Sequence, residues 1–181
     1  MNERIYKYDT IGVNEVGTIL LNKNVYVTDP CYNTTTWCQK LLDNVSPGRY
    51  KCFVIVSDEG DWGHRVSELH VVKEETFGKY KELEDIPYKA EPLNCTIGVD
   101  SGQCGVFDAE YYEKYQPDDD YDNPDSWYRK ICELTYNAGT IDNLGVATAS
   151  GYGDGSYPLY VAEENNEVVA IKVVFIEEEE I

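Results

Sequence analysis

Short runs of β-branched and aromatic residues recur along the whole chain, and turn residues bound each of them. The run Arg49–Ser57 follows the turn Ser46-Pro47-Gly48, and in Arg65–Lys73 the residues Val66, Leu69 and Val71 are candidates for an inner face. Runs of this length and composition are typical of β-strands. The other runs of this kind are Val16–Leu21, Asn24–Thr28, Cys95–Val99, Gly105–Phe107, Gly145–Ser150, Tyr157–Ala162 and Val168–Ile176.

Two pairs of these runs are predicted to form hairpins. Val16–Leu21 and Asn24–Thr28 flank Asn22-Lys23, and Tyr157–Ala162 and Val168–Ile176 flank the turn-forming residues 163–166. Asn supplies turn geometry because its side chain bonds the local backbone and tolerates a positive φ.

Three segments are predicted as helices, namely Thr35–Leu42, Ala109–Tyr115 and Pro124–Ala138. The third has the clearest signals, because Asn123 can cap it, Pro124 suits its first position and Gly139 ends it. Gly78–Pro92 is polar and reads as a loop. We therefore expect one α+β domain over residues 1–176, a twisted antiparallel β-sheet with two or three packed helices, followed by an acidic tail at residues 177–181.

The charge of the chain narrows the choice of partners. It has 181 residues with 34 acidic and 15 basic side chains, a net charge of −19 and a pI near 4.3. Such a surface repels phosphates, which argues against binding to nucleic acids or anionic membranes and favours a basic protein surface. No apolar run approaches 18 residues, and Met1–Tyr8 lacks an apolar signal core. We therefore expect a cytoplasmic protein of a bacterial cell.

The negative charge is concentrated in the second half of the chain. Residues 1–90 hold 14 acidic and 11 basic residues, whereas residues 91–181 hold 20 and 4. Tyrosines interleave with acids in the densest stretch, Asp108–Asp125. Acidic side chains interleaved with tyrosines are the composition expected of a surface that binds a groove lined by Arg and Lys. A solvated loop is the alternative. The predicted partner-binding residues are Glu110, Glu113, Asp118, Asp119, Asp120, Tyr121, Asp122 and Asp125.

Two glycine-rich segments, residues 100–105 and 150–157, are the second candidate site. Glycine permits a positive φ and close approach of a ligand, and exposed N–H groups in such loops can bind anions. Neither segment matches a nucleotide-binding fingerprint, since both lack Lys and no helix clearly follows. Interlocking structural turns are the competing interpretation. The predicted ligand-loop residues are Asp100, Ser101, Gln103, Tyr152 and Asp154.

Catalytic and metal-binding signals are weak. The six cysteines show no zinc spacing, and His64 and His70 are the only histidines. Asp58, Glu59 and Asp61 could coordinate a hard cation, but the two glycines beside them fit a tight hairpin equally well. Cys104 sits in a glycine-rich segment without a histidine near it in sequence. We therefore predict no catalytic residue, no metal and no cofactor.

Several stretches together resemble a known family. They are VYVTDPCY at 25–32, TWCQKLLDNVSPGRY at 36–50, SDEGDWGHRVSEL at 57–69, IGVDSGQCGVFD at 97–108 and SGYGDGSYPLYVAEENNEVVAIKVVFI at 150–176. They are similar to small proteins of Firmicutes and their phages that carry a domain of unknown function. The resemblance implies a compact β-rich fold and an origin in mobile elements, and it supplies no catalytic residues.

Three functions remain open from the sequence. The first is a phage-type inhibitor, an anti-CRISPR protein that blocks a Cas9-type nuclease or another nucleic-acid-binding host protein by acidic occlusion or mimicry. The second is a sponge for a nucleotide signal, with Arg65, Arg129 and Lys130 as the few candidate bases. The third is a metal-dependent hydrolase built on Asp58, Glu59, Asp61, Asp100 and Asp154, which the shortage of histidine disfavours.

Overall fold

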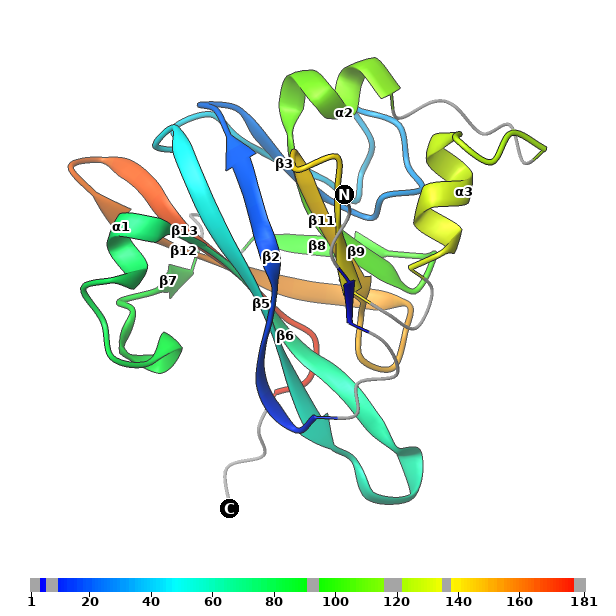
Figure 1. Cartoon of the computed structure of the whole chain (residues 1–181), viewed down its shortest axis with the longest axis horizontal. Coiled ribbons are helices and arrows are strands. Elements are labelled where there is room, and N and C mark those ends of the chain that lie inside the picture. The colour runs from blue at the N-terminus through cyan, green and yellow to red at the C-terminus, as the bar shows by residue number, and fades with distance from the viewer. Residues whose placement is uncertain (1–3, 6–9, 91–94, 116–121, 135–137, 178–181) are drawn as a thin grey trace.

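The chain forms two antiparallel β-sheets that pack against each other, as a computed structural model shows (Figure 1). The structure describes residues 4–5, 10–90, 95–115, 122–134 and 138–177. The first sheet has the order β1-β10-β11-β9-β3-β4, and the second has the order β2-β5-β6-β13-β12-β7, with β8 paired to the start of β12. The expected α+β class is wrong, because strands dominate both layers and the helices are short.

The described strands are β1 (Arg4–Ile5), β2 (Gly12–Leu21), β3 (Val25–Thr28), β4 (Lys40–Leu42), β5 (Gly48–Asp58), β6 (His64–Lys73), β7 (Lys89–Ala90), β8 (Thr96–Val99), β9 (Gln103–Asp108), β10 (Ala138–Ile141), β11 (Gly145–Ala149), β12 (Gly155–Glu164) and β13 (Glu167–Val174). The helical elements are η1 (Gly60–Trp62), α1 (Glu74–Phe77), η2 (Leu83–Asp85), α2 (Ala109–Tyr115) and α3 (Trp127–Cys132).

The main core lies between the two sheets. Alternate side chains of β3, β5, β9 and β13 point into it, with Val25, Val54, Val106 and Ile171 as fully buried examples. In β3 and β9 every residue is buried, because helices cover the outer face of the first sheet (Figure 1). A fully covered sheet explains why these strands read as continuous apolar runs rather than as an alternating pattern.

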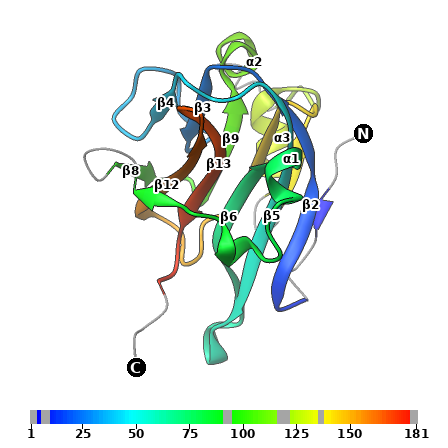
Figure 2. The ribbon, with the colours of Figure 1, turned by 90° about the vertical axis from the view of Figure 1, so that its left-hand side faces the viewer.

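Two smaller apolar clusters cover the outer faces of the sheets. Under α2 and α3, the Trp127 ring lies 5.3 Å from Phe107 and 5.6 Å from Tyr112, measured between ring centroids. On the other side, the arm formed by residues 74–90 packs Leu83 and Ile86 on the second sheet. Figure 2 shows this arm in front of β5 and β6.

Two turns that connect neighbouring strands have the geometry of tight hairpins. Asn165 and Asn166 join β12 to β13 with φ values of 53° and 65°, and Asp142 and Asn143 join β10 to β11 with 50° and 57°. Two successive residues with positive φ are typical of hairpin turns whose twist matches that of the flanking strands. Asn and Asp adopt a positive φ more readily than most other residues. The predicted hairpin over residues 163–166 is confirmed.

The predicted hairpin of Val16–Leu21 with Asn24–Thr28 is wrong. β2 pairs with β5, whereas β3 pairs with β4 and β9, so the chain crosses from one sheet to the other at Asn22–Asn24. The carboxylate of Asp108 fixes this corner, because its Oδ2 accepts a bond from the Asn22 N–H at 3.0 Å. A corner and a hairpin need the same turn residues, so composition alone does not separate them.

Two of the predicted helices also differ. Thr35–Leu42 forms no helix: Leu42 pairs with Val25 in β4, while the Trp37 side chain stays outside. The helix expected over Pro124–Ala138 begins later and is shorter, since Ser126 is its cap and accepts a bond from the Arg129 N–H. Asn123 instead bonds the N–H of Asp125 in the preceding turn. The helix Ala109–Tyr115 is confirmed.

Replacing Gly145 by Ala tests the contact between β11 and the aromatic cluster. A Cβ atom there would overlap the Phe107 ring, which is fully buried. We expect Gly145→Ala to lower the free energy of unfolding by about 1–3 kcal/mol, because well-packed cores tolerate extra volume poorly. Urea unfolding measures this. Gly78→Ala is the control, since its Cβ would make only ordinary contacts, and an equal loss in both variants would contradict the packing explanation.

His70 gives the second sheet a specific dependence on pH. Burial lowers the pKa of its imidazole, and the hydrogen bond to Glu68 opposes this shift only in part. Because the folded pKa lies below that of the unfolded chain, the unfolded state binds the proton first as the pH falls below about 6.5. Stability contributed by neutral His70 is therefore present above that pH and is lost on acidification.

We expect the free energy of unfolding to fall more steeply between pH 7.5 and 5.5 in the natural protein than in the variant His70→Gln. Urea unfolding at both pH values measures the difference, and this range lies above the titration of ordinary carboxylates. Identical slopes in the two proteins would show that His70 does not act this way.

Candidate functional site

The carboxylate of Asp29 organises the loops at one side of the molecule. Its Oδ2 accepts the N–H groups of Asp100 and Ser101, each at 2.8 Å, and its Oδ1 accepts the Ser101 hydroxyl at 2.7 Å and the Cys31 N–H at 2.9 Å. Asp29 is fully buried. A buried carboxylate needs such partners, and here they fix the loop after β8 against the loop after β3.

The backbone of the same segment is held by the helices. The Trp127 indole donates to the carbonyl of Pro30 at 2.7 Å, and the Tyr112 hydroxyl donates to the carbonyls of Asp29 and Tyr32. Aromatic side chains from α2 and α3 therefore bond carbonyls of the segment that follows β3. The Asp-Pro turn is more than the end of a strand, because it joins both helices to the loop after β8.

The loop between β11 and β12 lies against the loop after β8. The Ser150 N–H donates to the Gly102 carbonyl at 3.1 Å, and the Ser150 hydroxyl donates to the Gly153 carbonyl at 2.9 Å. Gly102, Gly151 and Gly153 all have positive φ values, which few other residues adopt. The two glycine-rich segments therefore form turns that are hydrogen-bonded to each other.

Arg65 connects this pair of loops to the tip of the β5–β6 hairpin. Its Nη1 donates to the Gly151 carbonyl and its Nε to the Trp62 carbonyl, both at 3.1 Å. Its guanidinium also lies over the Tyr152 ring at 4.7 Å. The Tyr152 hydroxyl in turn donates to Glu59 at 2.7 Å. The hairpin tip is therefore held in place by side-chain bonds.

These loops expose large aromatic side chains. Trp37 is 70% exposed, Trp62 69% and Tyr152 53%. Trp37 rests on Gly98, where a Cβ would overlap its ring, and its ring centroid lies 6.2 Å from that of Tyr32. The Tyr32 hydroxyl donates to Asp100 at 2.6 Å, which raises the pKa of Tyr32 to about 12. The Trp37 and Tyr152 rings therefore contact their neighbours.

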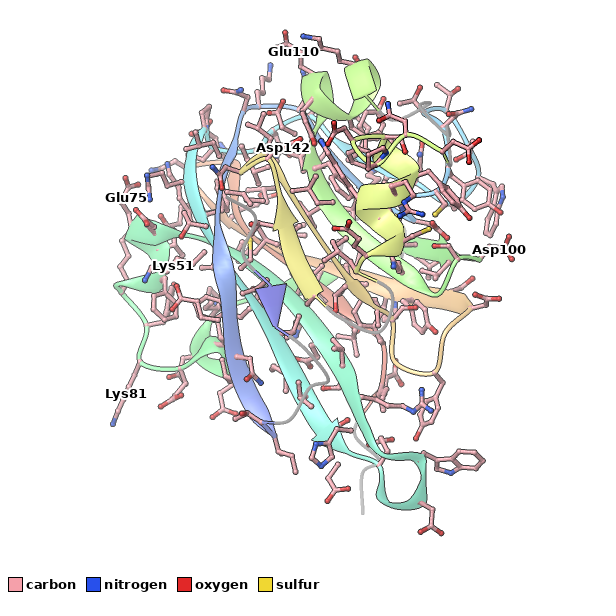
Figure 3. The ribbon with its side chains drawn as sticks, turned by 45° about the vertical axis from the view of Figure 1, so that its right-hand side comes forward. Lys51, Glu75, Lys81, Asp100, Glu110 and Asp142 are labelled. Atoms are coloured by element: carbon pink, nitrogen blue, oxygen red, sulfur yellow. The ribbon has the colours of Figure 1, made fainter. Side chains whose placement is uncertain are left out.

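We call this surface the loop face. Figure 3 shows Asp100 at its outer edge, pointing away from the sheets. It carries five carboxylates against one arginine, and that arginine is already engaged by carbonyls and a ring. Its residues are Tyr32, Trp37, Asp58, Glu59, Asp61, Trp62, Arg65, Asp100, Ser101, Tyr152 and Asp154.

Four of the five predicted ligand-loop residues lie on the loop face, namely Asp100, Ser101, Tyr152 and Asp154. Gln103 does not, since it is buried and donates to the Ile131 carbonyl at 3.0 Å. Between the loops is a cavity of about 220 Å³ lined by Arg65, Ser101 and Tyr152. Ligand sites usually measure about 300–1,000 Å³, so this hollow is small for a nucleotide. A larger cavity of about 770 Å³ adjoins the loop face, where Asp58, Glu59 and Tyr152 contribute to its lining.

The predicted partner-binding residues are only partly described. Asp118, Asp119, Asp120 and Tyr121 lie outside the described residues. The others are exposed and surround α2 and α3: Glu110 and Glu113 on α2, and Asp122 and Asp125 before α3.

The tyrosines of α2 have structural roles. Tyr111 and Tyr112 are buried in the cluster around Trp127, and Tyr26 donates to Glu113 at 3.2 Å. Tyr111 and Tyr112 thus serve the core rather than the surface.

The chemistry of the thiols does not indicate a nucleophile. Burial raises the pKa of Cys104 far above its ordinary value, and burial raises that of Cys31 to about 11. A thiol with a raised pKa holds little thiolate at neutral pH. Among the described residues, no three His, Cys, Asp or Glu side chains gather in a way that could hold a metal ion. In the same part of the chain, no helix combines the length and hydropathy needed to cross a membrane.

Of the exposed aromatic residues of the loop face, the sequence singled out Tyr152 but not the two tryptophans. Trp62 stands between Gly60 and Gly63 at the tip of a hairpin, where no core can receive it. The turn glycines on both sides of Trp62 were the feature of the sequence that could have indicated its exposure. Trp37 gave no such signal, because it was assigned to the apolar side of a predicted helix.

Comparison with known proteins places this architecture in one family. A family model described as "Protein of unknown function (DUF4241)" matches residues 20–173. No curated protein and no solved structure matches the chain. The matched range includes every segment of the loop face.

Replacing Asp29 by Asn tests whether this carboxylate holds the loops. An Asn side chain keeps the shape, but its NH2 group must face at least one N–H or hydroxyl that now bonds the carboxylate. We expect Asp29→Asn to lower the free energy of unfolding by about 2–3 kcal/mol, as measured by urea unfolding. Asp154→Asn, at an exposed position of the loop face, should change it by less than about 0.5 kcal/mol, and equal effects would refute the role of Asp29.

Proposed function

The chain belongs to the DUF4241 family of proteins of unknown function, and we propose that it is a binding protein that captures a basic protein partner through its loop face. The observation that carries this proposal is the set of three exposed aromatic rings among carboxylates, of which Trp37 and Tyr152 are held by their neighbours. Aromatic anchors of this kind dominate the energy of protein interfaces.

Tyr152 and Trp37 suit this role because their side chains have little conformational freedom left to lose on binding. Tyr152 is fixed by Glu59 and Arg65, and Trp37 by Gly98 and Tyr32. Trp and Tyr side chains offer a large contact area, and because each has only two side-chain torsions, fixing them costs little entropy. A surface that is already ordered binds with a smaller entropic cost than a flexible loop.

The charge of the loop face favours a partner rich in Lys and Arg. Asp58, Asp61, Asp100 and Asp154 are all exposed. Complementary charge accelerates encounter and excludes acidic proteins, and salt weakens both effects. Nucleic-acid-binding proteins present such basic surfaces, and a nuclease of the Cas9 type with its positive channel is one member of this class. An inhibitor of a host defence protein is the corresponding role.

The other two functions have less support in the described geometry. The hollow between the loops is small for a nucleotide. The larger cavity beside Asp58, Glu59 and Tyr152 has the volume for one, but its lining carboxylates would repel phosphates. Asp58, Glu59 and Asp61 share a hairpin tip whose nearest contacts are the Gly60 N–H and the Tyr152 hydroxyl. Neither arrangement brings an acid–base pair to a bound substrate.

Affinity capture followed by titration tests the proposal. The full chain is immobilised, proteins of a bacterial lysate are captured, and the captured protein is purified and titrated by calorimetry, alongside a guide-loaded Cas9-type nuclease. We expect a partner with a basic surface whose Kd rises at least tenfold for Trp62→Ala and for Tyr152→Ala, which corresponds to about 1.4 kcal/mol. The Kd should also rise with salt.

Two matched variants serve as controls. Tyr128→Ala removes an exposed ring outside the loop face and should change the Kd less than twofold. The quadruple variant Glu110→Gln, Glu113→Gln, Asp122→Asn and Asp125→Asn neutralises the described acids around α2 and α3. If that variant loses binding while the Trp37→Ala, Trp62→Ala, Tyr152→Ala triple variant keeps it, the loop face is not the interface. An acidic partner would also refute the proposal.

A further inference from the structure

Another cavity lies on the outer face of the second sheet, beneath the arm formed by residues 74–90. It measures about 460 Å³, which is within the usual range for small-molecule sites. The outer face of the second sheet forms its floor and the arm forms its wall. Apolar side chains line much of it, among them Ile55, Leu83, Ile86 and Ile176.

Glu68 presents a carboxylate of fixed orientation to this cavity. One of its oxygens bonds His70 Nε2 at 2.7 Å, and the Tyr88 hydroxyl bonds the other ring nitrogen of His70 at 3.1 Å. Burial alone would raise the pKa of Glu68, but His70 and the charge of Lys172 together lower it, so the group is ionised. Its second oxygen accepts no hydrogen bond from any described residue.

Lys172 presents an ammonium group to the same cavity. Its Nζ lies 4.8 Å from the centres of both the Tyr88 and the Tyr160 rings. Unlike Lys79 and Lys89, which bond Glu164 and Glu163, it has no carboxylate within 4.0 Å among the described residues. This is unusual in a chain with more than twice as many acids as bases, because a partly buried cation gains from a partner.

The cavity therefore combines the carboxylates of Glu68 and Glu84, the ammonium group of Lys172 and apolar side chains, with Glu68 and Lys172 too far apart for a direct ion pair. We propose that it binds a free α-amino acid with an apolar side chain. The ligand ammonium bonds Glu68, its carboxylate bonds Lys172, and its side chain contacts the apolar wall.

The two charges distinguish this ligand from simpler ones. A plain carboxylic acid would bring a second negative charge near Glu68, and an amine would bring a second positive charge near Lys172. Only a ligand that carries both charges satisfies both groups. Glu84, which also lines the cavity, further disfavours a purely anionic ligand.

Calorimetric titration of the full chain tests the proposal. The probes are L-leucine, L-phenylalanine, glycine, isovalerate and isopentylamine. We expect leucine or phenylalanine to bind, and glycine, isovalerate and isopentylamine to bind at least tenfold more weakly. Absence of heat with both apolar amino acids, or binding of isovalerate as tight as that of leucine, would overturn the proposal.

Variants locate the site. Lys172→Met and Glu68→Gln should each weaken the binding of the amino acid at least tenfold. Lys81→Met, at an exposed position on the outer side of the arm (Figure 3), and Glu167→Gln, at an exposed position beside a turn, are the matched controls and should bind normally. Thermal unfolding confirms that each variant is folded. If Glu68→Gln does not fold, Lys172→Met and the probe series decide, and unchanged binding by Lys172→Met overturns the assignment.

Discussion

The buried carboxylate of Asp29 is the interaction on which the arrangement of the loops depends. Four donors from two segments 70 residues apart in sequence converge on it. The carbonyls beside it are bonded by aromatic side chains of the two outer helices. One side chain thereby joins the end of a central strand, the loop after β8 and the helical layer. The position of the exposed Trp37 ring depends on this carboxylate as well. The Tyr32 ring beside Trp37 is held by the bond from its hydroxyl to Asp100, and that bond exists only while the two segments stay together.

Much of the strand content could be predicted from the sequence, but the pairing of strands could not. Runs such as Arg49–Ser57 are identified by β-branched residues alone, and Asn165-Asn166 by its turn chemistry. The error at Asn22-Lys23 arose because a corner between sheets and a hairpin use the same residues. The error at Thr35–Leu42 arose because this short segment carries no local sign that Leu42 pairs with Val25 or that Trp37 rests on Gly98. Both depend on contacts with residues far along the chain, which no local pattern contains.

The candidate site was predictable in part and for the same reason. Its glycine loops were evident from sequence, since positive φ values demand glycine. Its exposed rings were not, because the exposure of Trp37 and Trp62 depends on which loops leave the sheets. Gln103 was wrongly predicted to lie in the site. It follows a loop glycine, yet its side chain is buried and donates to a carbonyl of α3. Sequence position near a loop does not determine on which side of a sheet a residue lies.

The crossing at Asn22–Asn24 has a consequence for how the chain acquires its structure. In the first sheet, β3 pairs with β9 (residues 103–108), and β9 pairs with β11 (residues 145–149). The central strands of this sheet can therefore pair only after most of the chain has been synthesised. Assembly dominated by such distant pairings is slow relative to helical proteins of this size. During synthesis, the apolar segment Val25–Thr28 leaves the ribosome long before β9, the strand beside which it lies in the sheet. The order in which the strands are synthesised therefore differs from the order in which they pair.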